Sequence, residues 1–235
     1  MIMPGTGTLI NVACIIAGGL AGMLFGRFIR EDIQKSVNAA TGVACGFIGL
    51  HGAVSKALEI KDNVAMIVVL SITLGAVIGE LINIESYFER FGEWLKVKTG
   101  NSRDSQFVNA FLTASLTVSI GAMAIIGSIQ DGILRDYTTL ATKGVLDFII
   151  VMMMTASMGK GAIFSAIPVG VFQGTMTLLA ALIAPIMSEA ALNNISMVGS
   201  ILVACVGINL IWGRIIRVGN LLPALVIAVI ISMIL

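Results

Sequence analysis

Long runs of apolar residues, separated by short polar segments, dominate the chain. A helix needs about 20 apolar residues to cross the hydrocarbon core of a bilayer. Counting with that length predicts an all-α fold, a polytopic transmembrane helix bundle with about eight spans. The expected spans are Thr6–Gly26, Val37–Val54, Val64–Ile82, Phe107–Ile126, Leu140–Met158, Ala162–Ile183, Met197–Gly213 and Leu221–Leu235. We expect a break near Pro168 in the sixth, because proline interrupts the helical hydrogen bonds.

The segments between these spans differ in positive charge. With the N-terminus placed outside, the segments that face inside carry Arg27, Arg30, Lys35, Arg90, Lys96, Lys98, Arg103, Lys160, Arg214 and Arg217. The segments that face outside carry only Lys56, Lys61, Arg135 and Lys143. Lys and Arg are enriched in cytoplasmic loops. The asymmetry therefore predicts that both termini face outside and that the number of spans is even.

Residues 84–99 follow a different pattern from the spans. Phe88, Phe91 and Leu95 share one helical face, and basic residues accompany them. This pattern favours a short amphipathic helix on the cytoplasmic surface, with a plain connecting helix as the alternative. Apart from this helix, we expect residues 1–235 to form a single integral membrane domain.

A faint internal similarity links the two ends of the chain. TGVACGFIGLHGAV, which begins at Thr41, resembles GSILVACVGINLIWG, which begins at Gly199. Each segment is followed by a short basic linker and another apolar helix. Under the topology above, the first three and last three spans face opposite ways. This suggests an inverted repeat, an architecture common in transporters, with the binding site near the membrane midplane.

The composition supports the membrane class. The chain is 57% hydrophobic and 11% charged, with a mean hydropathy of +1.02, whereas a soluble domain is roughly a quarter charged. The net charge of +1 argues against nucleic acid as a partner. No Lys or Arg precedes the first apolar run, and Arg27 and Arg30 follow it, which favours a retained helix over a cleaved signal peptide.

The sequence lacks the patterns of an enzyme, a metal site or a cofactor site. Cys14, Cys45 and Cys205 lie in apolar runs without metal or redox spacing, and His51 alone cannot build a zinc site. No hydrolase pattern surrounds His51, and no P-loop is present. We therefore expect no enzymatic activity, no metal and no cofactor.

Glycines recur every four residues in the first expected span, at Gly18, Gly22 and Gly26. This spacing lets two helix backbones approach closely, because no side chains stand between them. The series can pack two helices of one chain or join two subunits. Its length favours a subunit contact, and we expect a homo-oligomer.

The stretch 140–174 mixes apolar runs with groups that hydrocarbon cannot satisfy. Asp147 lies about 10 Å inside its helix, where an ionised carboxylate is costly unless it is paired or hydrated. Lys143 lies four residues earlier on the same helical face and is the expected partner. The alternatives for this pair are an ion pair at the membrane boundary and part of a transport pathway.

Beyond Asp147, the helix is expected to break and then restart. Glycines weaken it, and proline withholds a backbone N–H. Open backbone groups beside polar side chains can bind an ion or a small solute. The residues expected to face a hydrated cavity are Asp147, Gly159, Lys160, Gly161, Ser165 and Gln173. The alternative is a dry core in which these groups satisfy one another.

Two more acidic residues lie close to the ends of spans. Glu80 is expected to form a structural ion pair with Arg27. Asp131 suggests either the mouth of a cation path or a turn residue that caps the next element.

Three asparagines, Asn11, Asn109 and Asn209, bring amides into apolar spans. An amide needs a partner from outside its own helix, so these residues indicate interhelical hydrogen bonds or a solute site. We include all three among the candidate pathway residues.

The pattern GSIQDG…LATKGVLD…MGKGAIFSAIPVGVFQG, with GAVIGELINIE before it and NLLPALV after it, resembles a bacterial family. This is the YdfK/YqgA-like family of inner-membrane proteins of unknown function, and the resemblance covers nearly the whole chain. It implies a multi-pass protein of the bacterial inner membrane. Its members are often drawn with six or seven spans, and the resemblance implies no substrate.

Three functions fit these patterns, all with the lipid bilayer as a partner. The first is a secondary transporter of a small solute or ion. The second is an oligomeric ion channel, and the third is a membrane scaffold or sensor. Saturable, gradient-coupled uptake would indicate a transporter, whereas unitary currents would indicate a channel.

The charge asymmetry makes the topology testable. Reporter fusions at Leu235 and near Lys96 should report opposite sides of the membrane, with Lys96 in the cytoplasm, because positive charge is retained there. A result that places both fusions on one side contradicts this topology.

Overall fold

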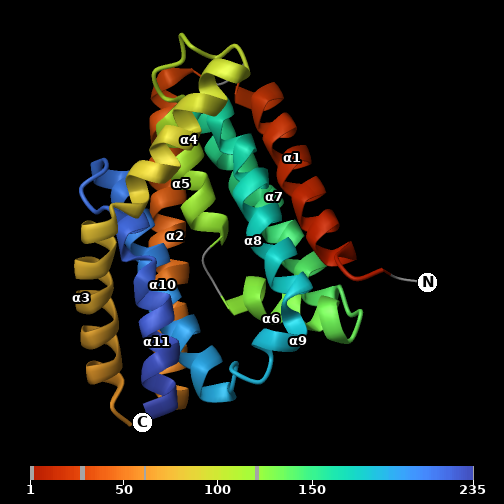
Figure 1. The fold of residues 1–235 in the computed structure, drawn as a ribbon. Helices are drawn as coiled ribbons and strands as arrows, with labels where there is room; N and C mark the ends of the chain where they lie inside the picture. The colour runs from red at the N-terminus through yellow and green to blue at the C-terminus, as the bar shows by residue number, and fades with distance from the viewer. Residues whose placement is uncertain (1–2, 27–29, 61, 120–121, 235) are drawn as a thin grey trace. The chain divides into compact units, whose positions relative to one another are not determined.

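A computed structural model describes residues 3–26, 30–60, 62–119 and 122–234 (Figure 1). Within these residues the secondary structure is helical and contains no strand. The elements are α1 (Thr6–Gly26), α2 (Glu31–Ile60), α3 (Val64–Ile82), α4 (Ile84–Lys98), α5 (Phe107–Ser119), α6 (Ala122–Ile133), α7 (Thr138–Met158), the 3₁₀ helix η1 (Lys160–Ser165), α8 (Ala166–Leu178), α9 (Ala180–Ile183), α10 (Glu189–Trp212), the 3₁₀ helix η2 (Val218–Leu221) and α11 (Pro223–Ile234).

Six helical segments of the described chain are long and apolar enough to cross a membrane: α1, α2, α3, α7, η1 with α8, and α10. The fourth expected span is not one straight helix, because α5 and α6 meet at 62°. This bent pair raises the count to seven if it forms one span, and α11 lies in a shorter apolar segment. The protein is thus a multi-pass helical membrane protein, and eight spans remain a prediction.

The helices group into two compact units whose segments alternate along the sequence. Unit 1 contains residues 1–41, 89–119 and 123–183. Unit 2 contains residues 42–88, 120–122 and 184–235. The expected single membrane domain remains a prediction.

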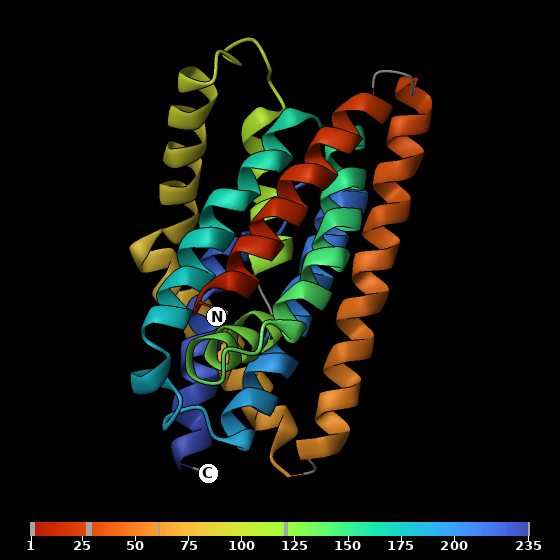
Figure 2. The ribbon, with the colours of Figure 1, turned by 90° about the vertical axis from the view of Figure 1, so that its right-hand side faces the viewer.

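In unit 1, α1 lies against both α7 and α8 (Figure 2). A Cβ atom at Gly18 would lie 2.3 Å from the Phe148 carbonyl oxygen, and one at Gly22 would lie 2.4 Å from the Met152 carbonyl oxygen. At Gly26 the nearest atoms, those of Ala156, would be 3.2 Å away. The rising numbers on both helices show that α1 and α7 run parallel.

The glycine series therefore packs two helices of one chain. Because α7 covers the glycine face of α1, these residues do not support a subunit contact. The homo-oligomer stays a prediction.

The helix break lies just after α7. Gly159 ends α7 with φ 107°, a conformation that favours glycine, and the chain continues as η1 before α8 begins. A Cβ atom at Gly161 would lie 1.9 Å from the Phe107 carbonyl oxygen, so η1 lies directly against the start of α5. The break expected near Pro168 is therefore misplaced. Pro168 lies in the first turn of α8, where a missing N–H costs no helical hydrogen bond.

In unit 2, α10 packs on the part of α2 that begins at Gly42. A Cβ atom at Gly42 would lie 2.9 Å from the Gly207 carbonyl oxygen, and one at Gly49 would lie 2.4 Å from the Ala204 amide nitrogen. The residue numbers of the contacts rise along α2 as they fall along α10, so these two helices are antiparallel.

The next pair of unit 2, α3 and α11, packs in the same way (Figure 1). A Cβ atom at Gly75 would lie 2.5 Å from the Ala224 amide nitrogen, and one at Gly79 would lie 1.7 Å from the Asn220 carbonyl oxygen. The two similar segments of the sequence thus pack antiparallel, as do the helices that follow them. An inverted repeat would have this arrangement, but the repeat itself remains a hypothesis.

The amphipathic segment forms α4, close to the expected bounds. Trp94 is exposed, whereas Leu95 is buried, and the Phe91 ring contacts both Trp94 and Phe111 of α5. The exposed and buried sides fit an interfacial helix, and its cytoplasmic location remains a prediction.

The contact between α1 and α7 yields a matched pair of variants. Gly22→Ala should lower the free energy of unfolding by about 1–3 kcal/mol, because its methyl group would meet backbone atoms that cannot move independently. Gly174→Ala in α8 is the control, since a Cβ atom there has no neighbour within 4 Å. It should keep or raise stability, as alanine favours helix over glycine. Thermal unfolding in mild detergent measures both, and equal midpoints would contradict the close contact.

Candidate functional site

Unit 1 buries polar side chains within helices that are otherwise apolar. An ionised or amide group in such a place requires partners from the protein, from water or from a ligand. The members of the expected set in this unit with buried polar side chains are Asn11 of α1, Asp131 of α6, Asp147 of α7, Ser165 of η1 and Gln173 of α8.

Lys143 and Asp147 form an ion pair along α7, as the sequence predicted. Both side chains are at most 7% exposed, so the pair is inside the protein. The Lys143 Nζ atom also donates a hydrogen bond of 2.6 Å to the Val118 carbonyl oxygen of α5. Asn11 lies close to the Asp147 carboxylate, although neither polar atom of its amide meets the geometry of a hydrogen bond. A backbone contact brings Asn11 there, because a Cβ atom at Gly144 would lie 3.3 Å from the Asn11 Cα.

Ser165 and Gln173 are fully buried, and their side-chain polar atoms have no hydrogen-bond partner among the described residues. Leaving such a group unsatisfied costs about 1–3 kcal/mol. Several unsatisfied groups in one unit are unfavourable for a purely structural core. They are typical of a place where water or a solute supplies the missing partner.

The packing of α8 on α1 shows how deep Ser165 and Gln173 lie along the helix axis relative to Asn11. A Cβ atom at Gly170 would lie 3.2 Å from Val12, and α8 runs antiparallel to α1. Relative to Asn11, Gln173 then lies about 3 Å along the α1 axis in one direction and Ser165 about 9 Å in the other. The buried ion pair is next to Asn11. The polar groups thus occupy about 12 Å of the depth of unit 1.

Asp131 holds the beginning of α1. Its Oδ2 atom accepts hydrogen bonds from the backbone N–H groups of Gly5 at 3.1 Å and Gly7 at 3.0 Å. The first N–H groups of a helix lack internal partners and carry a partial positive charge, so a carboxylate is stabilising there. Asp131 lies inside α6 rather than in a turn, and it caps α1 rather than the next element.

A polar hollow adjoins the helix break. It consists of adjoining hollows of about 330, 440 and 560 Å³, which share lining residues. The charged and amide residues that line it include Gln34, Lys35, Asn38, Asn101, Arg103, Asp104, Gln106, Asn109 and Lys160. Among the described residues of its lining, three side chains are cationic and one is a carboxylate. The structure thus brings Asn109, Gly159 and Lys160 of the expected set together at one hollow.

The whole chain matches one protein family. The family described as "Protein of unknown function (DUF554)" matches residues 6–233. The chain belongs to the DUF554 family. No solved structure matches the chain.

Two bacterial relatives of the DUF554 chain cover nearly its full length. The "Uncharacterized membrane protein YdfK" of Bacillus subtilis (strain 168) is 28% identical over 221 residues, which are 94% of this chain and 93% of the relative. The "Uncharacterized protein YqgA" of Escherichia coli (strain K12) is 27% identical over 226 residues, 94% of each chain. These relatives confirm the family that the sequence motifs indicated, and the first supports the membrane assignment.

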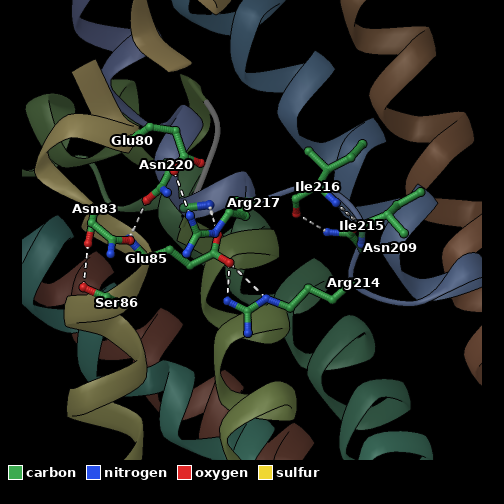
Figure 3. Close-up of polar contacts among 11 residues, drawn as sticks. Glu80, Asn83, Glu85, Ser86, Asn209, Arg214, Ile215, Ile216, Arg217 and Asn220 are labelled. Atoms are coloured by element: carbon green, nitrogen blue, oxygen red, sulfur yellow. Dashed lines mark hydrogen bonds and ion pairs between the residues drawn. The ribbon is translucent and has the colours of Figure 1, made fainter. Parts of the chain in front are cut away.

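Unit 2 of the DUF554 chain contains a polar network that the sequence did not single out (Figure 3). The Glu85 carboxylate, which is 2% exposed, accepts a hydrogen bond of 2.9 Å from the Arg214 Nε atom and one of 2.8 Å from the Gly219 N–H. The Glu85 N–H in turn donates to the Asn220 side-chain oxygen at 2.8 Å. This network joins the start of α4 to the loop after α10 and to η2. Its only signal in the sequence is an acidic residue at the end of an apolar span.

Glu80 is ion-paired, but with a different partner from the expected one. Its carboxylate lies 2.7 Å from Arg217, and both side chains are about half exposed. The expected partner, Arg27, lies outside the described residues. Glu80 therefore belongs to the same end of unit 2 as Glu85 (Figure 3).

Asn209 closes the turn after α10. Its Nδ2 atom donates to the Ile216 carbonyl oxygen at 2.7 Å, and its Oδ1 atom accepts from the N–H groups of Ile215 and Ile216 at 3.0 and 2.9 Å. The oxygen and the nitrogen of the Asn209 amide are thus both bound to the backbone of the turn. Asn209 belongs to unit 2 and is not part of the polar set of unit 1, so its pathway role remains a prediction without this support.

The two glutamates offer a matched test of the network. Glu85→Ala should lower the free energy of unfolding by about 3 kcal/mol, because it removes the buried carboxylate that accepts from Arg214 and from the Gly219 N–H. Glu80→Ala should cost at most about 1 kcal/mol, since its ion pair is exposed to solvent. Thermal unfolding in detergent compares them. Equal losses would show that Glu85 does not hold this end of the unit.

Proposed function

We propose that this protein is a secondary transporter of a small solute or ion in the bacterial inner membrane, and not an enzyme. The proposal is carried by the buried polar set of unit 1, in which Asp147, Lys143, Asn11, Ser165 and Gln173 occupy about 12 Å of depth. Ionisable residues inside membrane-spanning helices are costly, and they commonly mark ion or substrate pathways.

Two helix discontinuities beside this set support the proposal. One lies between α7 and α8, where η1 interrupts the helix, and the other lies between α5 and α6. Broken helices expose backbone carbonyls and N–H groups in the interior, and transporters use these groups to bind solutes and ions.

The polar hollow provides an entrance to this region. It lies at the end of α7, at the residues that the charge asymmetry assigns to the cytoplasm. Thr155 lines it, and the buried hydroxyl of Thr155 has no hydrogen-bond partner among the described residues. Asp147 follows about 12 Å further along the same helix. We propose that the pathway runs from the hollow past Thr155 to the Lys143–Asp147 pair.

Water access provides the test of this pathway. Single cysteines at Ser165 and Gln173, in a chain with Cys14, Cys45 and Cys205 replaced by alanine, should react with a water-soluble thiol reagent in intact membranes. Ser157→Cys at the hollow is the positive control. Val169→Cys, in the apolar core of unit 1, is the negative control and should be protected.

The two outcomes are distinct. Reaction at Ser165 or Gln173, with protection at Val169, supports a hydrated pathway. Full protection at both positions in a folded protein means that the polar groups form a dry core, and the transport proposal then fails. If the pathway is hydrated, gradient-coupled uptake into proteoliposomes separates a transporter from a channel.

A further inference from the structure

The ammonium group of Lys143 lies where a helix ends inside the protein. The last carbonyl groups of a helix have no internal partners and carry a partial negative charge. Val118 is the penultimate residue of α5, and its carbonyl oxygen accepts the 2.6 Å hydrogen bond from Lys143 Nζ. The ammonium therefore neutralises a helix end in a place that is only 5% exposed.

Other oxygen atoms are found in the same place. The Asp147 carboxylate is ion-paired with Lys143, and the Asn11 amide lies close to that carboxylate. The Asn11 Oδ1 atom has no donor among the described residues. A carboxylate, an amide oxygen and the carbonyl at a broken helix end are the groups with which membrane transporters coordinate monovalent cations.

We propose that these groups form a monovalent-cation site, and that Lys143 fills it with a cation tethered to the chain. In the native protein the site therefore does not take sodium or potassium. When the lysine side chain is shortened, the carboxylate and the helix end remain, and a free sodium or potassium ion replaces the ammonium.

An ordinary ion pair along one helix would need only Lys143 and Asp147. Here the ammonium also reaches a carbonyl of a second helix, and an amide from a third helix lies beside the carboxylate. A buried carboxylate next to a helix C-terminus combines two negative groups, and a positive charge is needed to keep both in the interior. The charge can come from lysine or from an ion of similar size, which is what the experiment distinguishes.

One consequence is that sodium does not occupy this position during transport. That consequence rests on the proposed function. Cation binding itself does not depend on that proposal. The experiment below measures binding without any solute, so its failure is distinguishable from a failure of the transport proposal.

The test uses the full-length protein in mild detergent, with thermal unfolding measured in sodium, potassium or N-methylglucamine chloride at equal ionic strength. The wild-type midpoint should be the same in all three salts. Lys143→Ala should unfold at a lower temperature in N-methylglucamine, and sodium or potassium should raise its midpoint by about 5 °C, as expected for a bound ion well above its Kd.

Two control variants define the site. Lys143→Ala combined with Asp147→Asn should show no cation response, because it lacks the carboxylate. Lys98→Ala removes an exposed lysine of α4, which is not part of the buried polar set or of the hollow, and should behave like the wild type. A wild-type protein stabilised by sodium over N-methylglucamine would overturn the proposal, as would a folded Lys143→Ala variant that responds to no cation.

Loss of folding would also be informative. If Lys143→Ala yields folded protein only in sodium or potassium, the ion has replaced the ammonium, which supports the proposal. Lys143→Ser, whose hydroxyl adds an oxygen, is the second variant. If neither folds in any salt while the double variant does, no free cation can take the place of Lys143, and the proposal is wrong.

Discussion

The direct contact between the backbones of α1 and α7 is the interaction on which unit 1 depends. The two helices run parallel. Three glycines, Gly18, Gly22 and Gly26, leave no side chain between them, so their backbones lie in close contact. The same approach brings Asn11 to the level of Lys143 and Asp147. A wider separation would leave the charged pair in an apolar interface without the amide.

The polar groups singled out in the two units have different surroundings. In unit 2, the buried Glu85 and the partly buried Asn209 lie near helix ends, where backbone N–H groups, a carbonyl oxygen and Arg214 are their hydrogen-bond partners. In unit 1, Ser165 and Gln173 lie within apolar helical segments and have no partners among the described residues. Satisfied groups at helix ends stabilise a fold, whereas unsatisfied groups at depth cost stability. Unit 2 also contains a buried hydroxyl without a partner among the described residues, that of Ser71 in α3. The larger number of such groups in the described part of unit 1, together with its buried Lys143–Asp147 pair, directs the functional interpretation to unit 1.

The helix break at Gly159 lies at the polar hollow, which Gly159 and Lys160 line. Because Gly161 allows η1 to touch the start of α5, the chain can leave the helical path without opening a gap. Lys160 and the polar hollow therefore lie at the end of α7, the helix that carries the buried Lys143–Asp147 pair. A proline break within α8, as the sequence suggested, would have placed the discontinuity on the other side of Ser165.

The sequence by itself determined the features that follow local rules. Apolar length predicted a multi-pass helical membrane protein, the motifs indicated its family, four-residue spacing predicted the Lys143–Asp147 pair, and paired glycines predicted the break at Gly159–Gly161. Each of these depends on residues that are neighbours in the chain, whose geometry a helix dictates.

Only the tertiary structure decided which distant groups meet. Arg217 pairs with Glu80 across 137 positions, and Asp131 caps a helix that begins more than 120 residues earlier. Spacing rules cannot choose among several arginines or several helix ends, because the choice depends on how whole helices pack. For the same reason, the sequence showed that the glycines of α1 permit close packing but not that α7 would be the helix against them.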